Sequence, residues 1–175
     1  MDVNLTVAMP GALFVVGILA VWAIWGVVWS SRTRALARIF PDSEVISGIR
    51  SKALDMATAA YVSRAQWIDG PGAFPLSFTV VMTPEGASFW KSRRSQIVSV
   101  PWSDLGPVTF ILIPQSPRRF RGINFQVTSE TSPIDLPIIA IGRGPFGQFA
   151  QSKAAIQSAC TRAESWRLAA AARVA

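Results

Sequence analysis

The chain begins with a long apolar run that ends abruptly at a group of arginines. Residues 11–30 contain no charge, and Arg32, Arg34 and Arg38 follow directly. A helix of about 20 residues covers roughly 30 Å, the thickness of the hydrocarbon core of a bilayer. The pattern therefore predicts an uncleaved transmembrane helix over residues 11–30, preceded by an extracytoplasmic tail over residues 1–10.

The residues that flank this run predict an orientation. Residues 1–10 contain no Lys or Arg, and basic residues usually stay on the cytoplasmic side of a membrane. A cleaved export signal would need a basic N-terminal region, but the only charge before Gly11 is that of Asp2. The expectation is a single-pass protein of the cell (plasma) membrane, with its N-terminus outside and the bulk of the chain in the cytoplasm.

Two sets of residues divide the faces of the predicted span. A track of small residues consists of Gly17, Ala20, Ala23 and Gly26, and an aromatic set consists of Trp22, Trp25 and Trp29. Small residues allow another helix to approach closely in lipid, so both sets are candidate helix-packing residues for an integral-membrane partner. The alternative is that these residue types are simply common in membrane helices.

The next segment, residues 31–55, is predicted to be a basic juxtamembrane linker followed by a short amphipathic helix. Asp42 or Ser43 can cap this helix after Pro41. Its apolar face would consist of Val45, Ile49, Ala53 and Met56, which recur at helical spacing. The pattern turns toward alternation near Thr58, where a first strand is expected, but it does not fix the boundary between helix and strand.

The remaining pattern predicts short strands and then one helix. After a Gly- and Pro-rich loop at 69–75, strands are expected at 76–83, 87–92, 97–100, 108–113, 123–129 and 134–141. A helical stripe from about Pro145 to Ala172 closes the chain. The predicted fold is a mostly-β (α+β) domain over residues 56–172, a seven-strand antiparallel barrel or sandwich capped by the C-terminal α-helix.

One stretch carries a resemblance to a known family. Residues 77–110 contain a "T-x-x-G" hairpin, a basic segment and the step "VPWSDL" from Val100 to Leu105. This stretch resembles the bacterial PH-like (pleckstrin-homology superfold) domains, of the actinobacterial type carried on a single-pass membrane anchor. Within this stretch, Trp102 and Leu105 are interpreted as packing residues and Asp104 as a turn or cap residue. Specific inositol-phosphate binding is not expected, since residues 67–75 offer Asp69 but no Lys or Arg.

Composition narrows the possible chemistry. The chain has no histidine, which excludes His-based triads and most catalytic zinc sites. It has one cysteine, Cys160. The glycine pattern at 142–147 follows a strand and precedes a helix, but no second parallel strand follows it to complete a dinucleotide site. We expect no enzymatic activity, no cofactor and no bound metal.

Charge suggests the kind of partner. The formal net charge is +7, and half of the residues are hydrophobic. Besides the three arginines after the apolar run, two loops are basic. The first loop carries Lys91, Arg93 and Arg94, and the second carries Arg118, Arg119 and Arg121. These residues are candidate contacts for anionic lipid or a protein partner; the alternative is that they are solvated loops. Nucleic acid is not expected, because no recognised motif is present.

Together these features predict a non-enzymatic membrane protein with a cytoplasmic PH-like interaction domain. The favoured function is an accessory or scaffold subunit of a larger membrane protein complex. The alternative is a membrane-surface sensor that binds anionic lipid through loops 91–94 and 118–121.

Overall fold

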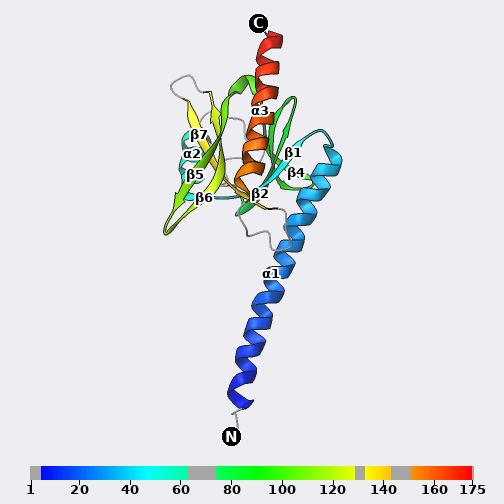
Figure 1. Ribbon diagram of the computed structural model, residues 1–175, viewed down its shortest axis with the longest axis vertical. Helices are drawn as coiled ribbons and strands as arrows, with labels where there is room; N and C mark the ends of the chain where they lie inside the picture. Colours follow the sequence, from blue (N-terminus) through cyan, green and yellow to red (C-terminus); the bar gives the residue numbers. More distant parts are fainter. Residues whose placement is uncertain (1–4, 63–73, 129–132, 143–150, 175) are drawn as a thin grey trace.

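The computed structural model describes residues 5–62, 74–128, 133–142 and 151–174, which form a β-sheet domain with one long projecting helix (Figure 1). The helices are α1 (Leu5–Ile39), α2 (Lys52–Val62), the short 3-10 helix η1 (Trp102–Asp104) and α3 (Lys153–Val174). The strands are β1 (Glu44–Ile49), β2 (Ser77–Thr83), β3 (Gly86–Ser92), β4 (Ser95–Pro101), β5 (Leu105–Gln115), β6 (Arg118–Val127) and β7 (Ile134–Ile141).

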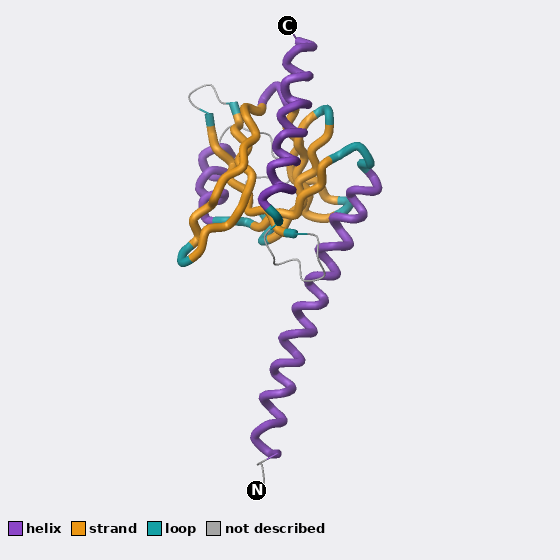
Figure 2. Tube along the Cα trace, in the orientation of Figure 1, coloured by secondary structure: helices purple, strands orange, loops and turns teal. Residues whose placement is uncertain are grey.

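The strands form one antiparallel sheet of seven, in the order β4-β3-β2-β1-β7-β6-β5. The first strand lies in the middle of this order, where β1 pairs with β2 on one side and with β7 on the other. The sheet bends around its core, and α3 packs against β5 and η1 (Figure 2). Seven antiparallel strands followed by a C-terminal helix make the topology PH-like, as the resemblance in residues 77–110 implied.

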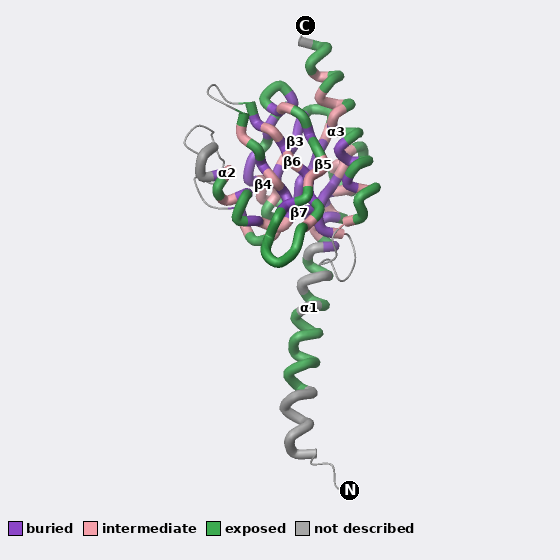
Figure 3. The backbone as a smooth tube through the Cα atoms, turned by 60° about the vertical axis from the view of Figure 1, so that its left-hand side comes forward, coloured by how far each residue is buried: buried purple, intermediate pink, exposed green. Residues whose placement is uncertain are grey.

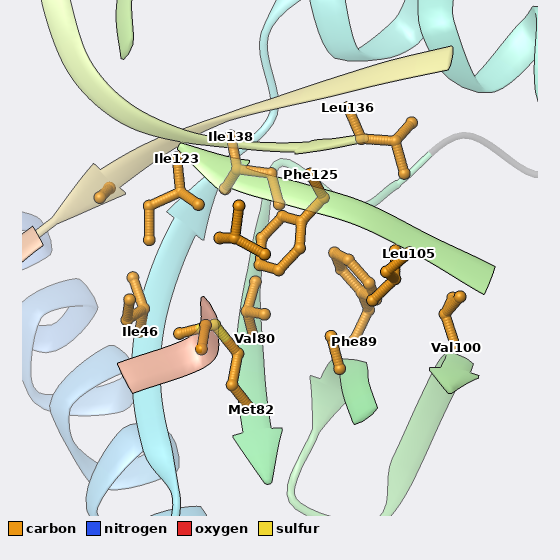
Figure 4. Close-up of a cluster of buried hydrophobic side chains, with 14 of the residues drawn as sticks. Ile46, Val80, Met82, Phe89, Val100, Leu105, Ile123, Phe125, Leu136 and Ile138 are labelled. Carbon is orange, nitrogen blue, oxygen red and sulfur yellow. The ribbon is translucent and has the colours of Figure 1, made fainter. Parts of the chain in front are cut away.

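Alternation along the strands builds the core on the inner face of the sheet. Side chains from β1, β2, β3, β6 and β7 point toward one another there (Figure 4). Among them, Ile46, Val80, Phe89, Phe125 and Ile138 are each at most 2% exposed. Helix α3 closes this core with its buried residues Ile156, Ala159, Cys160 and Ala163.

The last turns of α1 cover part of the outer face of the sheet. Leu36 packs against Val45 and Val81, all three fully buried. Beside them the rings of Phe40 and Trp90 lie with their centroids 5.8 Å apart. Because both faces of β1 and β2 are covered, these strands are buried along nearly their whole length.

The predicted transmembrane helix over residues 11–30 is wrong. In the part of the chain that the structure describes, no helix is both long enough and apolar enough to cross a bilayer. Residues 11–30 are the middle of α1, which continues without interruption into the turns that pack on the sheet. Ser30 and Thr33 are already buried in that contact. The interpretation of this segment as a single-pass membrane anchor is therefore wrong as well.

The short amphipathic helix predicted within residues 31–55 is also wrong, because Glu44–Ile49 is strand β1. The first strand expected near Thr58 is replaced by α2. The other six predicted strands are confirmed within a few residues. The C-terminal helix is confirmed from Lys153; its expected start at Pro145 and most of the glycine pattern at 142–147 lie outside the described residues.

Candidate functional site

The longest exposed apolar surface in the described chain lies on α1, before that helix reaches the sheet. We call residues 13–28 the arm. Leu13 and Phe14 are 72% and 71% exposed, and the other large apolar side chains described there are at least 46% exposed. The arm extends away from the domain as an exposed rod (Figure 3). Apolar patches of this extent are rare on soluble monomers and usually mark interaction sites.

The small-residue track lies on this arm. Gly17, Ala20 and Ala23 are exposed, and a Cβ added at Gly17 would meet nothing within 4 Å. Gly26 and the three tryptophans Trp22, Trp25 and Trp29 belong to the same helix, but their side chains lie outside the described part of the structure. The described members of the track are therefore free to receive another helix.

A polar contact fixes α1 to the sheet where the arm ends. The Arg32 guanidinium donates from Nη1 to the carbonyl oxygens of Ser77 (3.2 Å) and Lys91 (2.9 Å). The hydroxyls of Thr33 and Ser47 lie 2.6 Å apart in a hydrogen bond. Burial lowers the pKa of Arg32 below its ordinary value. Arg32 was expected to contact lipid or a partner, but it serves the fold.

The other two arginines after the apolar run remain exposed. Arg34 donates to the carbonyl and hydroxyl oxygens of Ser30, at 3.2 and 3.0 Å, within its own helix. Arg38 is exposed on the following turn. Both guanidinium groups are accessible to an anionic partner, in contrast to that of Arg32.

The two basic loops are hairpins whose charged residues are all exposed. Lys91, Arg93 and Arg94 surround the β3–β4 turn, whereas Arg118, Arg119 and Arg121 begin β6 after the β5–β6 turn. Polar residues in short hairpin turns are expected at the surface. Because these residues are exposed, they are available for binding. Exposure alone does not identify the binding partner.

Both hairpins lie at the end of the domain from which the arm leaves. Ile49, the last residue of β1, pairs with Ser77, the first residue of β2. The bonds from Arg32 to Ser77 and Lys91 bring the end of β3 to the same place. The β5–β6 hairpin points the same way as the arm in Figure 1. We call this the arm end of the domain.

Acidic residues are distributed differently. Among those that the structure describes, only Asp55 lies at the arm end, and Arg50 pairs with it at 2.6 Å. The others lie toward the opposite end, where Arg162 pairs with Glu44 at 2.9 Å and Arg167 pairs with Glu164 at 2.9 Å. The arm end is therefore strongly basic, and a surface of negative charge would favour this side of the domain.

The residues of the "VPWSDL" step have structural roles. Trp102 is buried, and its indole Nε1 donates to the carbonyl of Thr83 at 2.8 Å. Leu105 is buried beside it, and the carbonyl of Asp104 accepts from the backbone N–H of Thr128. The packing roles of Trp102 and Leu105 are confirmed, and Asp104 is the last residue of the 3-10 helix η1.

The remaining chemical candidates are not arranged as a reactive site in the described residues. Cys160 is buried in the core, and burial raises the pKa of its thiol to about 11. In the described part of the chain, no three His, Cys, Asp or Glu residues are placed to hold a metal ion. A cleft of about 740 Å³ between η1 and the end of α3 has Glu85 and Arg167 as its charged lining residues.

An apolar cluster on the outer face of the sheet was missed by the sequence reasoning. Ile113, Ile139 and Ile141 are buried there, and Ile49 and Phe120 pack against them. The signal was the continuous apolar run at 138–141, which is typical of a strand covered on both faces. This run did not reveal the cluster, because Ile49 was expected to lie in a helix and not in a neighbouring strand.

No family model matches the chain, and no curated protein matches its sequence. The arm, the basic arm end and the cavities of the domain are the features of the described chain that bear on its function.

Proposed function

We propose that the protein is a non-enzymatic accessory or scaffold subunit of a larger membrane protein complex, and that its partner binds along the arm. The observation that supports this proposal is the exposure of the described apolar side chains between Leu13 and Val28. Each square ångström of apolar surface left in water costs about 25 cal/mol relative to burial. An arm of this length is therefore strongly stabilised by a partner that covers it.

The composition of the arm favours a helix of the partner as the covering element. Gly17, Ala20 and Ala23 place small side chains at neighbouring positions on one side of α1. A partner helix can approach such a side closely, and van der Waals contacts then hold the pair together. The domain, fixed to α1 through Arg32, would be held at a defined angle to the partner.

The test is purification of the tagged full-length protein in a mild nonionic detergent, followed by native mass determination and identification of associated chains. We expect one membrane complex at fixed stoichiometry. A protein that emerges alone, or with acidic lipid only, would contradict the subunit proposal.

Matched variants connect any association to the arm. Replacing Gly17, Ala20 and Ala23 together by Leu keeps the arm apolar but fills the close-approach side, so the complex should be lost. The control changes Val15 and Ile18 to Phe, which adds bulk on the opposite side of the helix. The control should retain the complex, and equal loss in both variants would exclude the small-residue side as the contact.

A second function is favoured by the gathering of both basic hairpins at the arm end. In this alternative, the domain binds an anionic lipid surface through loops 91–94 and 118–121. Each basic side chain close to such a surface contributes about 1 kcal/mol at moderate salt. The proposal predicts tighter binding to vesicles that contain phosphatidylglycerol than to neutral vesicles.

Charge reversal tests this second function. Changing Arg118, Arg119 and Arg121 together to Glu should abolish the preference for anionic vesicles at low salt and leave complex assembly intact. The control changes Arg38 and Arg173 to Glu, because these exposed residues lie away from the arm end. The lipid function fails if the triple variant keeps its preference for anionic vesicles.

A further inference from the structure

An apolar cavity lies outside the β-sheet core, at the base of the β5–β6 hairpin. Its volume is about 290 Å³, close to the lower end of the range of about 300–1,000 Å³ that is typical of small-molecule sites. The side chains of Ile49, Phe120, Ile139 and Ile141 form its apolar wall. It thus uses the outer-face cluster, which the arm and its proposed partner do not involve.

Strand alternation explains why the cavity is apolar. Ile138 and Ala140 of β7 point into the core, so Ile139 and Ile141 point to the outer face. Helix α1 covers the outer face over Val45 and Val81, farther along the sheet. The cavity opens beyond that cover, where β7 meets the hairpin.

The rim of the cavity is polar and carries one charge. It consists of Gln115, Ser116, Pro117 and Arg118, all exposed. Arg118 and Phe120 lie on the same face of β6, so the guanidinium stands above the apolar wall. Arg119 lies on the other face of the strand and does not line the cavity.

We propose that this cavity binds the alkyl chain of a medium-chain fatty acid, with the carboxylate held by Arg118 at the rim. The wall of isoleucine and phenylalanine side chains stabilises an alkyl chain by removing it from water. An Arg–carboxylate pair is charge-assisted and fixes the orientation of the ligand. The surrounding positive charge of the arm end favours an anionic head group over a neutral or cationic one.

The site goes beyond the proposed function and differs from surface attraction in one respect that can be measured. A charged surface responds similarly to the loss of either neighbouring arginine, because both are exposed. A ligand in the cavity responds to Arg118 and hardly to Arg119. Arg118 and Arg119 therefore carry the same charge on the same strand, but their side chains lie on opposite faces of the sheet.

The experiment uses the full-length protein in a neutral maltoside detergent and a C12 fatty acid with a diazirine near the end of its chain. After irradiation, labelled residues are located by peptide mass spectrometry. We expect labelling of Phe120, Ile139 or Ile141, competition by unlabelled dodecanoate, and much weaker labelling by the neutral amide of the same probe.

Three variants complete the test. Arg118→Glu should reduce labelling about tenfold at a subsaturating probe concentration, as expected from loss of a charge-assisted hydrogen bond. Arg119→Glu should change labelling by less than about twofold. Gln115→Trp should fill the entrance and prevent labelling. Circular dichroism verifies the fold of each variant, and Arg118→Gln replaces Arg118→Glu if the latter does not fold.

The outcomes separate binding in the cavity from adsorption to the arm and from attraction to the charged surface. Labels confined to the arm, or equal losses in Arg118→Glu and Arg119→Glu, would overturn the proposal. Labelling that unlabelled dodecanoate does not compete would also overturn it. None of these results depends on whether a partner covers the arm, so this site and the proposed subunit function can fail independently.

Discussion

The guanidinium of Arg32 on α1 donates a hydrogen bond to the backbone carbonyl of Lys91 on β3, at a distance of 2.9 Å. The same nitrogen also donates to the carbonyl of Ser77 on β2. One side chain therefore joins the helix to two neighbouring strands at the point where the arm begins. This contact sets the direction in which the arm leaves the domain.

Loss of this side chain should loosen α1 from the sheet. Arg32→Ala removes both hydrogen bonds and is expected to lower the free energy of unfolding by about 1–3 kcal/mol. Chemical denaturation of the full-length protein in nonionic detergent measures the change. Arg34→Ala is the matched control, because Arg34 is exposed and bonds only within its own helix. An equal effect of the two variants would contradict the role of Arg32.

Arg32→Met should be milder than Arg32→Ala. The Nε and Nη2 atoms of Arg32 are buried and have no hydrogen-bond partner in the described residues. A buried charge with unsatisfied donors is costly, and an apolar side chain of similar length can replace it at little loss. Thermal unfolding of the two variants under the same conditions gives their order, and the reverse order would contradict this interpretation.

Trp102 should contribute through its indole nitrogen as well as its volume. Trp102→Phe leaves an aromatic ring in the core but removes the bond to the Thr83 carbonyl. The expected cost is about 1–3 kcal/mol of unfolding free energy. Trp166→Phe is the control, because Trp166 is only partly buried at the edge of the same core. Equal losses would show that the hydrogen bond makes no separate contribution.

Cys160 predicts a fall in stability at alkaline pH. Burial raises the pKa of its thiol from 9.0 to about 11, so the folded state holds a proton that the unfolded state has lost between these values. The free energy of unfolding should therefore be unaffected below pH 9 and decrease as the pH rises toward 11. Cys160→Ala should show a smaller decrease over the same window when denaturation curves are compared. An identical pH dependence in both proteins would contradict this prediction.

The pairing of β2 with β3, β3 with β4, β5 with β6 and β6 with β7 was predictable, because these strands follow one another along the chain with short connections. Strands β4 and β5 lie at opposite edges of the sheet and do not pair, so the alternation of hairpins does not relate the β3–β4 turn to the β5–β6 turn. The gathering of Arg93 and Arg118 at one end depends on the bending of the sheet and did not follow from the sequence. The burial of Arg32 did not follow, because residues 31–55 were interpreted as a linker beside a membrane.

The missed first strand has a simple physical cause. Val45 and Ile49 are four residues apart, and both a helix and a strand place residues at this spacing on one face. Ile46 and Gly48 distinguish the two periods, since a strand turns them to the opposite face, where Ile46 reaches the core. The helix that follows, Lys52–Val62, contains alanines and other residues whose weak pattern gave no clear period. The outer cavity could not be predicted either, because Ile49, which lines it, was expected to lie in a helix.

Two glycines should respond in opposite ways to the same substitution. A Cβ at Gly122 would lie 2.3 Å from the carbonyl oxygen of Ile138 and 2.6 Å from Cδ1 of Ile113, so Gly122→Ala must push apart β6 and β7. We expect a loss of about 1–3 kcal/mol, the usual cost of overpacking, or failure to fold. Gly17 lies in the arm with open space around it, and Gly17→Ala should stabilise α1 by about 0.5–1 kcal/mol. Denaturation and helical circular dichroism of both variants test the pair. A neutral Gly122→Ala would contradict the close approach of the strands, whereas a destabilising Gly17→Ala would show that the arm is already packed against another element.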